Sequence, residues 1–298
     1  MRLALAAGAI LRGLGQVMFQ PDARAGAVFL FALVVGAPVL ALAALAGAMV
    51  STGITRICGA DVHAGLHGFN GALAGIAMAL FPGAGLPPLV QAMLVLAAPA
   101  LAALVFLRLA SALAAIRLPV LTAPFNLVAL PVLALVHVAS GPLVPGAHDG
   151  GAGMLLVLRG VVNGFAQVFF LHGLLPGLLV AAGLALASPR AFGLALAASA
   201  GGAVLALVLG ADPGAVGAGL FGYNGILTAI SLGTVALAPG RGTVALALAA
   251  ALVTVPAHLA LAHLLSAAGL PGLTLAFVLV TWGAVLLARR LRIGVVHG

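Results

Sequence analysis

The chain has 298 residues, of which 64% are hydrophobic and only 5% are charged, and its mean hydropathy is +1.34. A water-soluble domain cannot cover such a composition with polar surface, so the chain must be solvated mainly by lipid. The twelve basic residues are all arginines spread along the sequence, which fits the edges of membrane spans and not a nucleic-acid surface. We therefore expect one membrane domain over residues 1–298, with the lipid bilayer as a partner and no nucleic acid.

Apolar segments in chain order predict an all-α, multi-pass membrane protein. Residues 1–14 have arginines near both ends and no clear cleavage site, so we expect them to lie tilted or at the interface. Ten apolar runs follow, at about 26–50, 64–81, 86–107, 118–138, 153–171, 174–187, 191–209, 215–238, 243–268 and 271–288. Roughly 20 apolar residues span a bilayer as a helix. The arginines after the last run favour a cytoplasmic C-terminus.

Two of these runs differ from the others. Residues 64–81 and 215–238 are rich in Gly and are interrupted by Asn. In a membrane, interrupted helices occur where the freed backbone groups are buried in protein or line a polar path. These two runs therefore predict re-entrant or broken helices.

The chain contains an internal repeat made of three motifs. Residues 13–19 return as 164–170, residues 64–73 as 218–227, and residues 118–125 as 270–277, at offsets of 151, 154 and 152 positions. Chance explains this poorly, because Gln and Asn each occur only four times and one pair of each is related by the repeat.

The repeat predicts how the chain is organised. Repeat 1 covers about residues 1–150 and repeat 2 about residues 151–298. If each repeat crosses the membrane an odd number of times, five being our estimate, the repeats are inverted relative to one another. We then expect a pore at their interface.

Catalysis has little support in the sequence. There is no Lys or Glu, the four Asp stand in apparent connectors, and no Gly-x-Ser-x-Gly motif occurs. His63 and His67 have metal-ligand spacing but no acidic partner, so we expect no metal, no cofactor and no enzyme. Asp61 and Asp212 are expected to cap helix starts.

What remains is an uncharged polar set flanked by aromatic residues. It consists of Gln16, Gln167, Asn70, Asn224, Thr122 and Thr274, beside Phe19, Phe170, Phe69 and Tyr223. A neutral planar amide that leaves water needs replacement acceptors, because an unpaired buried amide costs roughly 2–7 kcal/mol. Aromatic faces and aliphatic neighbours can form a flat slot that excludes hydrated ions. The plainer alternative is structural, since Thr often bonds its own helix and Asn can tie a broken backbone.

At these motifs the sequence resembles the urea transporter family, over residues 13–277. That family carries in each half a Gln/Glu-Val-x-Phe segment, a Gly-Leu-x-Gly-Phe/Tyr-Asn-x-x-Leu segment and a Leu-Pro-x-x-Thr-x-Pro-Phe segment. The resemblance implies five membrane helices and one tilted re-entrant helix per half, in an inverted repeat. It also implies a homotrimer with a passive pore and selectivity filter in each protomer.

The resemblance further implies roles for residues of this sequence. One end of the selectivity slot is framed by Val17, Phe19, Phe69 and Leu73, and the other by Val168, Phe170, Tyr223 and Leu227. Thr122 and Thr274 lie at the midpoint, and Gln16 and Gln167 order the oxygen acceptors.

Three departures from the family pattern stand in repeat 2. Ala276 replaces the proline found at Pro124, Tyr223 replaces the phenylalanine found at Phe69, and Gln167 stands where one half often has Glu. The Tyr223 hydroxyl could narrow the slot or offer a further hydrogen bond to the solute.

The sequence thus predicts a passive urea channel of the bacterial inner membrane. Two alternatives stay open. One is an ion- or proton-coupled transporter of a small amide or amine, which would need intramembrane titratable groups. The other is an ammonia or ammonium channel, against which stands the lack of a histidine pair at repeat-related sites.

Overall fold

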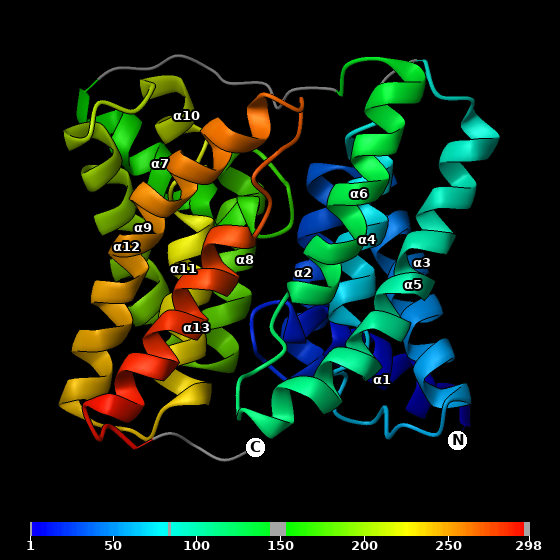
Figure 1. The fold of residues 1–298 in the computed structure, drawn as a ribbon, viewed down its shortest axis with the longest axis horizontal. Helices are drawn as coiled ribbons and strands as arrows, with labels where there is room; N and C mark the ends of the chain where they lie inside the picture. The colour runs from blue at the N-terminus through cyan, green and yellow to red at the C-terminus, as the bar shows by residue number, and fades with distance from the viewer. Residues whose placement is uncertain (1, 83–84, 144–152, 295–298) are drawn as a thin grey trace. The chain divides into compact units, whose positions relative to one another are not determined.

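The computed structural model describes residues 2–82, 85–143 and 153–294, and helices account for most of them (Figure 1). The helices are α1 Arg2–Gln16, α2 Ala23–Gly36, α3 Pro38–Ile57, α4 Phe69–Leu80, α5 Pro88–Ala115, α6 Ala123–Ser140, α7 Gly153–Gln167, α8 Leu174–Ala187, α9 Pro189–Val208, α10 Pro213–Gly217, α11 Tyr223–Ile230, the π-helix η1 Ser231–Ala236, α12 Arg241–Ser266 and α13 Leu275–Arg290.

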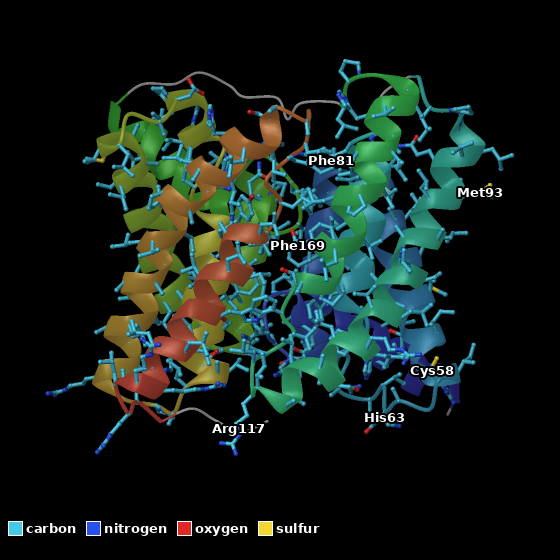
Figure 2. The ribbon with its side chains drawn as sticks, viewed as in Figure 1. Cys58, His63, Phe81, Met93, Arg117 and Phe169 are labelled. Atoms are coloured by element: carbon cyan, nitrogen blue, oxygen red, sulfur yellow. The ribbon has the colours of Figure 1, made fainter. Side chains whose placement is uncertain are left out.

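Five of the described helices, α3, α5, α6, α9 and α12, are long and apolar enough to cross a membrane. Their outer faces carry exposed apolar side chains, and Met93 on α5 projects away from the protein (Figure 2). Water would solvate such a surface poorly, whereas lipid tails solvate it well. The expected all-α, multi-pass membrane protein is therefore confirmed.

The residues group into two compact units. Unit 1 comprises residues 1–116, 120–146 and 262–271, and unit 2 comprises residues 117–119, 147–261 and 272–298. Each unit thus holds most of one repeat and a short segment of the other. In unit 2 the Trp282 indole Nε1–H donates to the Pro119 carbonyl oxygen at 2.8 Å. In unit 1 a Cβ on Gly269 would lie only 2.7 Å from the His137 ring.

The repeat extends from sequence to backbone conformation. The order α1 to α6 recurs as α7, α8, α9, α11 with η1, α12 and α13, and the short α10 is an addition in the second repeat. Left-handed residues recur at equivalent positions: φ is 60° and 58° at Phe19 and Phe170, and 55° and 44° at Leu121 and Leu273. Non-glycine residues adopt this conformation rarely, so its recurrence shows that the two copies share their local fold.

One expected run is wrong in its extent. Residues 26–50 belong to two helices, because α2 ends at Gly36 and α3 begins at Pro38. Ala37 between them is extended, with φ −162° and ψ 91°, as steric contact with a following proline favours. Ser188 before Pro189 has nearly the same conformation, φ −155° and ψ 100°, where the sequence did predict a break.

Both interrupted runs contain short helices. In residues 64–81 the chain makes turns before α4, which has 12 residues. In residues 215–238 the eight residues of α11 continue into the six-residue η1. Each is shorter than the roughly 20 residues of a full span. The first ten residues of α4 are all buried, and α4 packs against α3 and α5.

Of the two predicted aspartate caps, that of Asp212 is confirmed and that of Asp61 is wrong. The Asp212 carboxylate accepts a hydrogen bond from the Ala215 N–H at 2.8 Å and caps α10. Asp61 instead accepts the His63 N–H at 2.9 Å within a turn, well ahead of α4. Its carboxylate thus stabilises a loop and no helix start.

Candidate functional site

Ten of the twelve predicted site residues are buried, and the two left-handed phenylalanines, Phe19 and Phe170, are partly exposed. The ten are Gln16, Val17, Phe69, Leu73, Thr122, Gln167, Val168, Tyr223, Leu227 and Thr274. In unit 1 the second motif of repeat 1 contacts both the first and the third, and in unit 2 the second motif of repeat 2 does the same.

Each glutamine joins the first motif to the second. The Gln16 side-chain amide donates to the Ala64 carbonyl oxygen at 3.1 Å, and Gln167 donates to Ala218, also at 3.1 Å. Gln167 additionally lies 3.2 Å from Nδ1 of His172. The last residue of α1 or α7 is thereby fixed to the loop ahead of the short helix. The glutamines order backbone groups at this junction.

Glycines let the same two motifs approach closely. Gly65 and Gly219 have φ of 76° and 83°, in the region that glycine favours. A Cβ on Gly65 would lie 2.5 Å from the Gly13 backbone, and one on Gly219 would lie 2.4 Å from the Gly164 backbone. Only glycine fits at these positions.

The second motif reaches the third through asparagine. In unit 1 the Asn70 amide donates to the Leu121 carbonyl oxygen at 3.2 Å, while its Oδ1 accepts the Phe125 N–H at 3.0 Å. These contacts bracket Thr122, which is 1% exposed. Asn70 therefore ties the backbone of the second motif to that of the third, which is the structural role that the sequence analysis left open for it.

Unit 2 makes a related but different set of bonds. Asn224 Oδ1 accepts the Phe277 N–H at 3.1 Å, as its counterpart does. The Leu273 carbonyl oxygen, however, accepts the Tyr223 hydroxyl at 2.6 Å. The Asn224 amide nitrogen lies instead 3.3 Å from Nδ1 of His258.

The threonines occupy matching backbone positions. Thr122 precedes α6 with φ −92° and ψ 20°, and Thr274 precedes α13 with φ −99° and ψ 22°. Each follows a left-handed leucine, which turns the chain sharply into the helix. The structure thus holds both threonines in rigid, buried turns, which we call the threonine turns (residues 121–125 and 273–277).

Sequence reasoning missed Phe106 and His258. The Phe106 ring packs edge to face on His67 and Phe69, with centroids 5.1 and 6.3 Å away. His258 packs in the same way on Phe221 and Tyr223, at 5.6 and 5.8 Å. The two residues are 152 positions apart, the offset of the third motif, and this spacing was the available signal.

Among the described residues, the hydrogen bonds that join the three motifs are made by uncharged side chains. Asp22 caps α2 and pairs with Arg24 at 2.8 Å, and the Arg24 guanidinium holds the pKa of that carboxyl below its ordinary value. A cavity of about 380 Å³ in unit 1 is lined by Thr52, Arg56, Asp61, His63 and six apolar or small residues. None of the twelve site residues lines it.

In each unit buried amides, hydroxyls and backbone carbonyls meet among apolar helices, as suits a multi-pass membrane transport protein. The sequence matches the urea transporter family over residues 7–289. Urea transporter 1 of Rattus norvegicus is 30% identical over 285 residues, which cover 91% of this chain and 74% of that protein. Urea transporter 1 of Ovis aries and of Mus musculus are similar to the same degree. The chain belongs to the urea transporter family, which is a family of transport proteins and not of enzymes.

Proposed function

We propose that this protein is a passive urea channel. The observation that carries the proposal is that uncharged side chains hold two equivalent buried threonine turns, Asn70 in unit 1 and Asn224 with Tyr223 in unit 2. Family membership implies urea as the solute. Urea is a neutral planar amide, so oxygen acceptors along a path without fixed charge can replace the hydrogen bonds that urea makes to water.

The proposed path is a slot to which each repeat supplies one end. Val17, Phe19, Phe69 and Leu73 frame the first end, and Val168, Phe170, Tyr223 and Leu227 frame the second. Their apolar faces hold a flat solute edge-on, and a hydrated ion that enters finds no ligands to replace its shell. Thr122 and Thr274 serve the midpoint of the path.

The glutamines act indirectly in this proposal. Gln16 and Gln167 donate to carbonyl oxygens of the loops ahead of α4 and α11. Each bond fixes a backbone segment, and fixed carbonyls are better acceptors because they need no reorganisation as the solute passes. The proposal includes an inverted relation of the repeats, a homotrimeric assembly and a bacterial inner membrane.

Urea efflux from proteoliposomes, followed by stopped-flow light scattering against protein-free liposomes, tests the proposal. We expect fast urea flux that does not change when a proton or sodium gradient is imposed or collapsed. Flux that requires such a gradient would favour a coupled transporter. Faster flux of ammonium than of urea would favour an ammonia channel, and urea flux at the bare-lipid rate would refute the proposal.

A further inference from the structure

The two threonine turns are held by different donors. The Leu121 carbonyl oxygen receives the Asn70 amide, whereas the equivalent Leu273 carbonyl oxygen receives the Tyr223 hydroxyl at 2.6 Å. In unit 2 the Asn224 amide nitrogen lies instead 3.3 Å from Nδ1 of His258. Asn224 is 2% exposed, so its amide needs another partner inside the protein.

His258 is that partner. Because the Phe277 N–H donates to Asn224 Oδ1, the orientation of the Asn224 amide is fixed, and its NH₂ group points to His258 Nδ1 at 3.3 Å. Since the Asn224 NH₂ group can only donate, His258 Nδ1 must carry the lone pair, and the imidazole proton must lie on Nε2.

The imidazole takes the place of a phenyl ring. His258 corresponds to Phe106 of repeat 1, and both pack edge to face on two rings of the second motif. An imidazole keeps this packing and adds one acceptor, which a phenyl ring lacks. Space is provided by Gly272, where a Cβ would lie 3.2 Å from His258 Cε1, whereas repeat 1 has Val120 at the equivalent position.

We propose that His258 is a positioning residue for the second end of the slot and is coupled to Tyr223. His258 Nδ1 accepts a hydrogen bond from the Asn224 side-chain NH₂ group. Asn224 Oδ1 can therefore keep its bond to the Phe277 N–H while the Tyr223 hydroxyl donates to the Leu273 carbonyl oxygen. The Thr274 turn therefore stays in the conformation of its counterpart. The Tyr223 hydroxyl donates its proton to the Leu273 backbone carbonyl and therefore does not donate to the solute. This inference rests on the proposed function for its effect on transport, and on the hydrogen bonds alone for its effect on structure.

Second-site rescue tests the coupling. His258→Phe removes the imidazole acceptor of the Asn224 amide, and we expect urea flux to fall about tenfold, as loss of one buried hydrogen bond would shift a conformational equilibrium. His258→Gln, which retains an acceptor, should lose less. Tyr223→Phe combined with His258→Phe recreates the residues of repeat 1, frees the Leu273 carbonyl for Asn224, and should recover most of the flux.

The control is His263→Phe, at an exposed histidine of the same helix, which should keep wild-type flux. Wild-type flux in His258→Phe, or a double variant no better than that single variant, would overturn the inference. If the wild-type protein itself does not conduct urea, the proposed function fails instead. The melting temperatures of the wild-type protein, Tyr223→Phe, His258→Phe and the double variant then carry the test. We expect the two substitutions to be coupled, and additive effects would contradict the inference.

A spectroscopic measurement avoids variants that fail to fold. In the wild-type protein with ¹⁵N-labelled histidine, the His258 signals, assigned by comparison with His258→Gln, should be those of the neutral form protonated at Nε2. Protonation at Nδ1 would exclude the hydrogen bond to Asn224 and with it the inference.

Discussion

Trp282 donates its indole N–H to the carbonyl oxygen of Pro119, a residue 163 positions earlier in the chain. The bond lies within unit 2, although Pro119 belongs to the third motif of repeat 1. Pro119 lies three residues before Thr122 in the chain, and the indole bond holds the backbone at Pro119 within unit 2. Trp282 is the only tryptophan of the chain.

Replacing Trp282 by Phe should lower the free energy of unfolding by about 1–3 kcal/mol, because the donor to Pro119 is lost and the smaller ring packs less well. Thermal unfolding in detergent, followed by circular dichroism, measures the effect. Leu279→Val, at a half-exposed position of the same helix, is the control. An unchanged melting temperature in Trp282→Phe would show that the bond contributes nothing to stability.

Thr122→Val and Thr274→Val should each slow urea flux roughly tenfold, because valine matches threonine in shape but lacks the hydroxyl, whose hydrogen bond is worth about 1–1.5 kcal/mol. Stopped-flow efflux gives the flux, and the melting temperature shows whether the variant is folded. Folded variants that conduct urea at the wild-type rate would remove both threonines from the proposed path.

Gly65→Ala and Gly219→Ala should both be strongly destabilising. The left-handed backbone alone costs an alanine roughly 1–3 kcal/mol, and the added Cβ meets the backbone of the first motif. Gly193→Ala in α9 is a matched control, since a Cβ there has no neighbour within 4 Å. It should be neutral or slightly stabilising. The melting temperatures compare the three, and equal values would contradict the close contact.

Asp22→Asn isolates the charge of the Asp22–Arg24 pair, because asparagine still caps a helix. The pKa of Asp22 is lowered in the folded protein, so its contribution is present above the unfolded-state value of 3.8 and is lost as the pH falls through the lower folded value. The variant should be slightly less stable than wild type at pH 7, because solvent-exposed ion pairs contribute little to stability. The two should converge in pH-dependent melting as the pH falls below the folded-state pKa of Asp22, and a constant difference would contradict the assignment.

The helices and their repetition could largely be predicted from sequence, because apolar runs and rare polar residues are strong signals in a membrane protein. The break at Ala37 was missed since the flanking residues are equally apolar. Alignment of the repeats would have revealed it, as Pro38 lies 151 positions before Pro189.

The hydrogen-bond partners within the site could be predicted only in part. A role for Asn70 in tying the backbone was one of two expected outcomes, but its partners lie more than 50 residues away and depend on packing. For the Tyr223 hydroxyl the sequence allowed two effects, a narrower slot or a further hydrogen bond to the solute, and the structure shows the hydroxyl donating to the Leu273 carbonyl oxygen. His258 lies outside the motifs, so the 152-residue spacing from Phe106 gained its meaning from the ring contacts that both residues make.

The exchange of short segments between the units has a consequence for biosynthesis. Unit 1 includes residues 262–271, so it cannot be completed until almost the whole chain has left the ribosome. The first repeat is therefore synthesised well before the segment that completes its unit. A chain truncated before residue 262 would be deficient in the half of the protein that was synthesised first.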